Sequence, residues 1–252
     1  MQSRSSNPWE KLIFALDVGE DQEEALSWVD RLSGHVGLFK IGKEAFTHFG
    51  PEIVRQVQQR GGDVFLDLKF HDIPNTVARA AEAATSLRVS MFNIHASGGK
   101  KMMEEAVSVT RVFAEKKALP LPVILAVTIL TSLNDQDLKD IGFRGTTREA
   151  VLGLARMAQD AGVPGVVASP QDIEDLRAAC GPDFLIVTPG IRGSGAAADD
   201  QKRTLSPLEA VSLGADYLVV GRPIRLASDP AGEADAIVGE IVQGLAGRGK
   251  SL

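Results

Sequence analysis

The chain of 252 residues is poor in cysteine and in positive charge, and each shortage excludes a class of protein. Its one cysteine, Cys180, cannot form an intramolecular disulfide, and no cluster of Cys and His suggests a structural zinc site. The 27 Lys and Arg against 33 Asp and Glu give a net charge of −6, so no overall basic field attracts nucleic acid. A local cationic site for a small anion is still compatible with this charge.

Long apolar runs are also missing. No run approaches the roughly 20 residues that a membrane-spanning helix needs. The first residues are polar, and the apolar stretch Leu12–Leu16 is too short for the core of a signal peptide and is followed by Asp17. These features predict a soluble, cytoplasmic protein.

Short apolar runs typical of buried strands alternate with amphipathic segments along the chain. The expected strands are Leu12–Leu16, Leu38–Ile41, Val64–Leu68, Met91–His95, Val123–Thr128, Gly165–Ala168, Phe184–Thr188 and Tyr217–Val220. The expected helices are Gln22–Leu32, Ile53–Gln59, Val77–Leu87, Lys101–Lys116, Arg148–Ala161, Ile173–Ala179, Pro207–Leu213 and Glu233–Leu245. Apolar strands separated by helices indicate an α/β protein with a parallel sheet covered by helices.

Eight such units in one chain of this length predict a (β/α)8 TIM barrel. We expect a single barrel domain over residues 11–252, preceded by a flexible tail of residues 1–10, because no linker interrupts the pattern. A doubly wound open sheet is the alternative. It is disfavoured because the first strand is followed by Asp17-Val18-Gly19-Glu20 rather than by a glycine-rich phosphate-binding turn.

The segment Asp67–Thr76 carries the most informative polar residues. Because side chains alternate along a strand, Asp67 and Lys69 are expected on one face at the end of the third strand. Asp72 adds a second carboxylate, and Pro74 ends the strand and suits the first turn of a helix. Two carboxylates around one lysine after a buried strand indicate a functional site rather than a surface ion pair.

Further polar residues follow other expected strands, whose carboxyl ends face the active site in this fold. These residues are Asp17, Lys40, His95, Thr131, Ser132, Arg192 and Arg222. We expect His95 to support its neighbours through hydrogen bonds rather than to act in catalysis. The convergence of lysines and aspartates from the first three strands predicts a nearly balanced network of charges.

The last two strands predict a phosphate site. Pro189-Gly190-Ile191-Arg192 and Gly221-Arg222 place glycine N–H groups and arginines in the loops where such barrels bind phosphate. Arginine is suited to this role because it makes paired hydrogen bonds to phosphate oxygens. The glycine- and alanine-containing stretch 192–202 is interpreted either as a lid or as an ordinary loop.

Taken together, these motifs resemble those of the orotidine 5′-phosphate decarboxylase family. Its signature Asp-x-Lys-x-x-Asp-Ile-Pro-Asn-Thr is matched by Asp67–Thr76. The resemblance continues, in order, through Ala15–Asp17, Phe39–Gly42, Asn93–Gly99, Leu130–Ser132, Thr188–Arg192 and Val219–Ile224. Sugar-phosphate enzymes of the same superfamily share the Asp-x-Lys-x-x-Asp part, and the continuation Ile73–Thr76 makes the match specific.

The resemblance implies conversion of orotidine 5′-monophosphate (OMP) to UMP and CO₂, the last step of de novo UMP synthesis, without metal or organic cofactor. It implies that Lys69 protonates C6 within a charged array that also contains Lys40, Asp67 and Asp72. It assigns substrate binding to Asp17, Lys40, Asp67, Thr76, Thr131, Ser132, Pro189, Arg192, Gln201, Gly221 and Arg222. It also implies a homodimer in which Asp72 and Thr76 reach the neighbouring subunit's site.

Two alternatives stay open from the sequence. One is a metal-dependent sugar-phosphate decarboxylase of the same superfamily, whose activity would be sensitive to EDTA. The other is a non-catalytic barrel that binds phosphoribosyl ligands such as UMP. A protein that only binds has no use for Lys69 between two carboxylates, which favours an enzyme.

Overall fold

Eight parallel strands form a closed barrel, in the order β1 to β8, in the computed structural model, which describes residues 7–191 and 205–248. This confirms the predicted fold class. The strands are β1 (Leu12–Ala15), β2 (Leu38–Gly42), β3 (Val64–Phe70), β4 (Met91–His95), β5 (Val123–Val127), β6 (Gly165–Val167), β7 (Leu185–Pro189) and β8 (Tyr217–Val220). Each begins and ends within two residues of its predicted bounds.

The α-helices of the described ranges are α1 (Gln22–Leu32), α2 (Lys43–Phe49), α3 (Glu52–Gln59), α4 (Pro74–Ser86), α5 (Lys100–Lys117), α6 (Asp135–Asp140), α7 (Thr147–Asp160), α8 (Ile173–Cys180), α9 (Pro207–Leu213), α10 (Arg222–Arg225) and α11 (Pro230–Arg248). The 3-10 helices are η1 (Pro8–Lys11), η2 (Ala96–Gly98) and η3 (Pro170–Asp172). All eight predicted helices are present; α2, α6 and α10 were not predicted, because each buries a single side chain and so shows no apolar period.

The amino-terminal boundary differs slightly from the expected one. Residues 1–6 of the expected flexible tail lie outside the described residues. The helix η1 begins at Pro8, so regular structure starts before residue 11. The backbone of Glu10 lies so close to Gly37 that a Cβ there would be 2.4 Å from the Glu10 Cα, which requires glycine at position 37.

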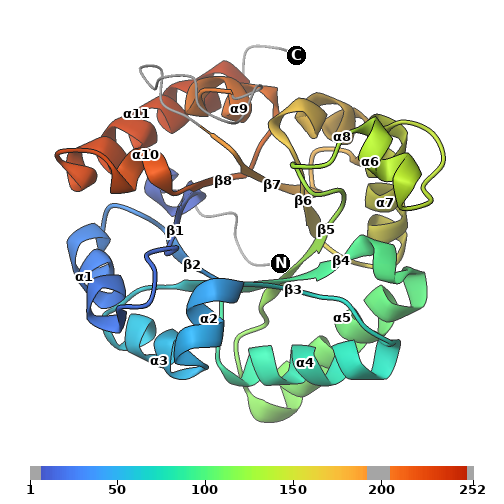
Figure 1. The fold of residues 1–252 in the computed structure, drawn as a ribbon, viewed down its shortest axis with the longest axis horizontal. Helices are drawn as coiled ribbons and strands as arrows, with labels where there is room; N and C mark the ends of the chain where they lie inside the picture. The colour runs from blue at the N-terminus through green and yellow to red at the C-terminus, as the bar shows by residue number, and fades with distance from the viewer. Residues whose placement is uncertain (1–6, 192–204, 249–252) are drawn as a thin grey trace. The chain divides into compact units, whose positions relative to one another are not determined.

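The chain forms two compact units, one of residues 1–67 and 188–252 and the other of residues 68–187. In the first unit, β1 pairs with β2 and β8, and β2 pairs with β3. In the second, β4, β5, β6 and β7 pair in that order, and Figure 1 shows α4, α5, α7 and α8 on the outer side of these strands. The boundaries fall inside β3 and β7 rather than in linkers.

In the first unit, aromatic side chains pack β1 and β2 against each other and against α1. The ring of Phe14 on β1 stacks on Trp28 of α1 at 5.7 Å and meets Phe39 of β2 edge-on at 6.3 Å. All three side chains are buried, and such ring pairs add to the free energy of burial. Asp21 accepts the N–H groups of the first turn of α1 and so fixes where the helix begins. The strands that carry the polar site residues therefore rest on a rigid core.

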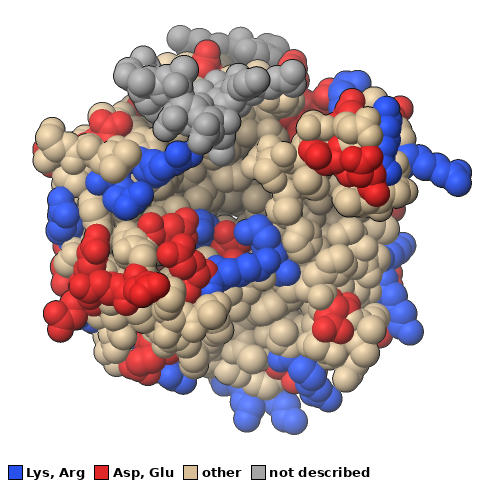
Figure 2. Space-filling model, viewed as in Figure 1, with Lys and Arg blue, Asp and Glu red and all other residues tan. Residues whose placement is uncertain are grey.

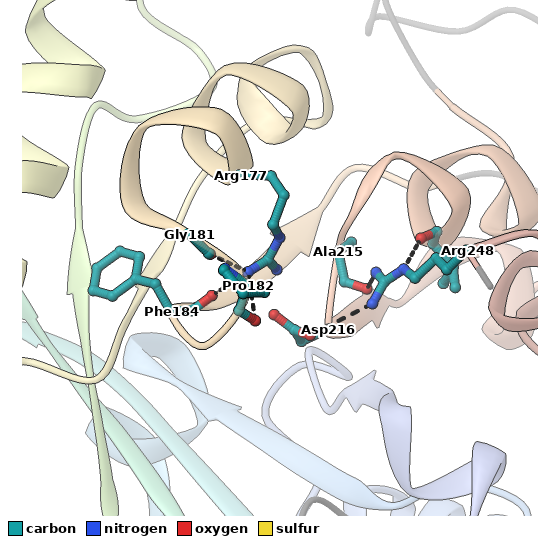
Figure 3. Close-up of polar contacts among 8 residues, drawn as sticks. Arg177, Gly181, Pro182, Phe184, Ala215, Asp216 and Arg248 are labelled. Atoms are coloured by element: carbon teal, nitrogen blue, oxygen red, sulfur yellow. Dashed lines mark hydrogen bonds and ion pairs between the residues drawn. The ribbon is translucent and has the colours of Figure 1, made fainter. Parts of the chain in front are cut away.

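Arg248, near the end of α11, anchors the entry into β8 (Figure 3). It donates hydrogen bonds to the carbonyl oxygens of Val211 and Ala215 and lies 3.6 Å from the buried carboxylate of Asp216. These groups precede the amino end of β8, whereas catalytic groups of barrels lie at the carboxyl ends. The contact is therefore structural.

Arg177 has the same kind of role in the second unit. Its Nη1 donates to the carbonyl oxygens of Gly181, Pro182 and Phe184 at 2.8, 3.1 and 2.7 Å (Figure 3). These carbonyls lie in the turn between the end of α8 and the start of β7, where neither helix nor sheet provides regular backbone partners. One guanidinium thus satisfies three acceptors in the turn.

Thr146 and Glu149 form a reciprocal cap at the entry to α7. The Thr146 hydroxyl accepts the N–H of Glu149, and the Glu149 carboxylate accepts the N–H of Thr146 at 2.8 Å. The hydrogen bonds that the N–H and the hydroxyl of Thr146 donate to the Glu149 carboxylate lower the pKa of Glu149 below its ordinary value. Arg148 forms an ion pair with Asp175 of α8 on the exposed surface.

Charged side chains of both signs occur on the face drawn in Figure 2, with acidic groups gathered over α6. The acidic residues of α6 are Asp135, Asp137 and Asp140. Asp137 reaches back to the N–H of Asn134, which caps the helix.

Among the helices described, none is long and apolar enough to cross a membrane.

Asp172, the last residue of η3, provides a test of stability against pH. Burial raises its pKa to about 6, against a hydrogen bond from the Ser169 backbone that lowers it. Because this pKa is higher in the folded chain than in the unfolded chain, the folded state binds more protons between about pH 4 and 6, and stability falls as pH rises through that window. Asp172→Asn should therefore increase the free energy of unfolding near neutral pH by on the order of 1–2 kcal/mol, after allowance for partial exposure.

The measurement is urea unfolding of both proteins near pH 7.5 and near pH 3. The gain in stability should be present at the higher pH and nearly absent at the lower one, where Asp172 is protonated in both states. An equal gain at both pH values would mean that titration of Asp172 is not its cause.

Candidate active site

In the first unit, Lys40 of β2 places an ammonium group between two carboxylates. Its Nζ lies 3.3 Å from both carboxylate oxygens of Asp17, which follows β1, and 3.4 Å from Oδ2 of Asp67 on β3. Lys40 and Asp67 are each only 9% exposed, whereas the Asp17 side chain is 48% exposed. Burying single charges is costly, so the pairing offsets the desolvation of Lys40 and Asp67. Asp17 keeps a face open to a ligand.

The register of the strands and one glycine make this network possible. Lys40 is the partner of Ala15 on β1, and Gly42 is the partner of Asp67 on β3. A Cβ on Gly42 would lie 3.0 Å from Oδ1 of Asp17 and 3.2 Å from Nζ of Lys40. Glycine at position 42 therefore leaves the space that the ion pair occupies.

The residues predicted to bind phosphate lie at the carboxyl ends of β7 and β8. Pro189 is the last residue of β7, and Gly221 follows β8 directly and precedes the exposed Arg222. A Cβ on Gly221 would lie 3.2 Å from the Cβ of Ala15, so glycine allows the backbone to approach β1 closely. Arg192 and Gln201, also predicted here, lie outside the described residues.

In the second unit, Lys69 has a backbone conformation that residues with side chains rarely adopt. Its φ is +53°, in the left-handed region, although it lies within β3. The backbone at Lys69 therefore departs from the extended conformation on which regular alternation of side chains depends, and the shared face of Asp67 and Lys69 stays a prediction. The N–H of Lys69 donates to Oδ1 of Asn93 on β4 at 2.8 Å.

Beyond Lys69, the predicted site residues of this unit are exposed. Asp72 and Thr76 are both exposed, and Oδ1 of Asp72 accepts the N–H of Ile73 at 2.6 Å. The helix α4 begins at Pro74, as predicted. Thr131 and Ser132 are exposed in the loop between β5 and α6.

Asn93 is a candidate site residue that the sequence reasoning missed. It is 1% exposed, and its side chain accepts the hydrogen bond from Lys69 described above. The available signal was a polar residue inside the otherwise apolar part of a strand, between Phe92 and Ile94. A buried amide needs hydrogen-bonding partners, so this position required an explanation.

The chemistry available to these residues is that of fixed charges. Buried and half-buried carboxylates and ammonium groups in a water-poor setting stabilise a developing charge without reorganising solvent. In the part of the chain that the structure describes, no three His, Cys, Asp or Glu side chains form a group that could hold a metal ion. The arrangement of Lys40 with Asp17 and Asp67 is suited to bind hydroxyl groups of a ligand, because carboxylates accept and an ammonium donates hydrogen bonds.

A sequence model of the orotidine 5′-phosphate decarboxylase / HUMPS family matches residues 10–237. The match covers most of the chain and includes every candidate residue named above. The chain belongs to the orotidine 5′-phosphate decarboxylase / HUMPS family. The resemblance drawn from the motifs of the sequence is thereby confirmed.

Individual members of the orotidine 5′-phosphate decarboxylase / HUMPS family match over nearly their full length. Orotidine 5′-phosphate decarboxylase of Syntrophus aciditrophicus (strain SB) is 62% identical over 240 residues, which cover 95% of this chain and 96% of that protein. The enzyme of Geotalea daltonii is 55% identical over 234 residues, with 93% and 97% covered. The crystal structure of orotidine 5′-phosphate decarboxylase from Lactobacillus acidophilus has a TM-score of 0.81 at 37% identity, with 91% and 98% covered.

Proposed function

We propose that the protein is an orotidine 5′-phosphate decarboxylase, which converts OMP to UMP and CO₂. The observation that carries the proposal is the charged set on β2 and β3 in a member of this family. Lys40 is held between Asp17 and Asp67, and Lys69 follows Asp67 by two residues in an unusual backbone conformation. Such a set has an evident use in a reaction whose intermediate is a carbanion.

In the proposed reaction, the bond between C6 and the carboxylate carbon breaks and its electron pair stays at C6. The ammonium group of Lys69 stabilises this charge electrostatically and then donates a proton, which forms the C6–H bond of UMP. The neutral amine of Lys69 regains a proton from solvent. Because the ammonium is fixed in place before the reaction, little reorganisation is needed as the charge develops.

The other proposed site residues bind and orient the substrate. We assign Asp17 and Lys40 to the ribose hydroxyls, because a half-exposed carboxylate accepts and an ammonium donates hydrogen bonds. Asp67, paired with Lys40, and Asp72 complete the charged array around the reacting carbon. Thr131 or Ser132 is assigned to the pyrimidine end of the substrate, and Pro189, the last residue of β7, to substrate binding beside the phosphate site.

Gly221 and Arg222, with Arg192 and Gln201, are assigned to the phosphate. The phosphate lies far from C6 in the substrate, so its binding energy serves alignment rather than bond breaking. Support for Gly221 comes from its close approach to β1, which brings backbone rather than side chain to this position. Arg222 is exposed and begins α10, so its guanidinium is accessible to a ligand.

Arg222→Ala should raise KM for OMP roughly tenfold to a hundredfold, since a charge-assisted hydrogen bond is worth about 1.5–3 kcal/mol. Turnover of orotidine, which lacks the phosphate, should hardly change. Steady-state kinetics with both substrates provide the measurement, and Arg225→Ala on the same short helix is the matched control. Equal losses toward OMP and orotidine would show that Arg222 supports the fold instead of binding phosphate.

The proposed active form is a homodimer in which Asp72 and Thr76 reach the neighbouring subunit's site. In support, both residues are exposed and lie beside Ile73, an apolar side chain that is 66% exposed. The Asp72 carboxylate also lies beyond the strand end, where it can serve either its own site or that of a partner.

A cytoplasmic location stays a prediction.

One assay tests the proposed function. The loss of OMP is followed by ultraviolet absorbance, with UMP identified as the product, in the presence and absence of EDTA. We expect turnover that EDTA does not affect. Loss of activity in EDTA would favour the metal-dependent sugar-phosphate decarboxylase, and binding of UMP without turnover would favour the non-catalytic barrel.

A further inference from the structure

We propose that Asn93 is a positioning residue for Lys69. Its side-chain oxygen holds the backbone of Lys69 in the left-handed conformation and thereby sets where the lysine ammonium points. This inference rests on the proposed function for its catalytic consequence, while the contact itself is a property of the fold.

The conformation of Lys69 needs an explanation that other left-handed residues do not. In the described ranges, the residues other than glycine with positive φ are Lys69, Arg88 and Ala118. Ala118 caps the end of α5, and Arg88 follows Leu87, the residue that caps α4; left-handed residues are common where helices end. Lys69 lies inside β3, where an extended backbone is the rule. A left-handed residue in a strand persists only where its surroundings impose it.

The surroundings that impose it include Asn93. The N–H of Lys69 donates to Oδ1 of Asn93 at 2.8 Å, so a side chain on β4 takes the place of a backbone acceptor. Asn93 is 1% exposed, and its neighbours Phe92 and Ile94 are fully buried. A side chain packed in this way has little freedom to move, so the position of its oxygen is fixed by β4. The N–H of Lys69 is fixed with it.

A second contact holds the turn that follows. The ring of His71 lies 5.3 Å from the ring of His95 on β4, and a Cβ on Gly98 would be 3.1 Å from Cδ2 of His71. Asn93 and His95 are two residues apart on β4, as Lys69 and His71 are on β3. The segment from Lys69 toward Asp72 therefore rests on the end of β4 at two points.

The consequence is a specific kinetic signature. Removing the Asn93 oxygen leaves the Lys69 ammonium present but lets its backbone relax toward an extended conformation. A displacement of about 1 Å at a catalytic group costs up to about 100-fold in rate. Asn93→Leu, which keeps the shape and loses the oxygen, should lower kcat about 10- to 100-fold and leave KM within about threefold.

Three further variants make the test decisive. Asn93→Asp keeps an acceptor oxygen at the same place in either protonation state, and its kcat should exceed that of Asn93→Leu at least about tenfold. Asn93→Ala carries the same expectation as Asn93→Leu if the latter does not fold. Thr128→Val removes another buried hydrogen bond, from Thr128 to the carbonyl oxygen of Val167, and should leave kcat unchanged. Equal losses in Asn93→Asp and Asn93→Leu would overturn the positioning role.

A measurement that needs no activity separates this inference from the proposed function. The amide hydrogen of Lys69 should exchange at least about tenfold faster in Asn93→Leu than in the wild type or in Thr128→Val, as followed by NMR. If the wild type does not decarboxylate OMP, the proposed function fails and this exchange rate alone decides the role of Asn93. If the wild type is active, an unchanged exchange rate, or an unchanged kcat in Asn93→Leu, overturns the inference and leaves the function intact.

Discussion

Lys69→Ala is expected to lower kcat for OMP by at least about 10²- to 10⁴-fold, the range typical for loss of a general acid. Its ammonium is needed when electron density appears at C6, so the loss concerns the transition state rather than binding of the product. The affinity for UMP should change by only a modest factor, because removing an interaction made in the transition state affects kcat more than ligand binding.

The measurement combines steady-state kinetics on OMP with calorimetric titration of UMP. Lys116→Ala is the matched control, because Lys116 is an exposed lysine in the last turn of α5, at the end of the helix opposite to the carboxyl end of β4. Its kcat should equal that of the wild type. Retention of more than about a tenth of the wild-type kcat in Lys69→Ala would rule out Lys69 as the proton donor.

Mixing two inactive variants should restore activity if each site takes Lys69 from one chain and Asp72 from the other. Lys69→Ala and Asp72→Asn should each be nearly inactive alone. Co-expressed in equal amounts, they pair at random, so about half of the dimers are hybrids, each with one intact site of two. Activity should then recover to about a quarter of the wild type, which is a large gain over either parent.

The composition of the dimers decides how this result is interpreted. Native mass spectrometry shows whether hybrid dimers have formed, and a mixture of Lys69→Ala with Lys69→Ala carrying a different tag serves as the control that cannot complement. If Asp72 served the site of its own chain, every site in a hybrid would carry one lesion. Confirmed hybrids without recovered activity would therefore exclude the shared site.

The fold could be predicted closely from the sequence because local signals and tertiary packing agree. Each strand of the barrel is a short apolar run, and runs such as Val64–Leu66 are bounded by glycine or polar residues that stop them. The main helices have the apolar period of one buried face. The motif Asp67–Thr76 could likewise be used to predict a candidate site, since its residues are contiguous in the chain.

What the sequence did not predict depends on contacts between distant residues. The left-handed backbone of Lys69 has no sequence signature, because the residue is not glycine and its partner Asn93 lies on another strand. The role of Gly42 could not be predicted either, since it depends on the side chains of Asp17 and Lys40 occupying the space beside it. Arg177 and Arg248 appear in the sequence as ordinary charged helix residues, and only the folded chain brings backbone carbonyls to them.

The contacts of Arg248 with Val211, Ala215 and Asp216, called the Arg248 clamp from here on, have a consequence for protein engineering. The Arg248 clamp fixes the chain at the amino end of β8, whereas the residues proposed for phosphate binding follow the carboxyl end of the same strand. Substitutions around the clamp can therefore be selected for heat tolerance with little interference from selection for turnover. A library restricted to the segments that precede the strands gives directed evolution a place to accumulate stabilising changes, which can later offset the destabilising changes that altered substrate preference usually requires.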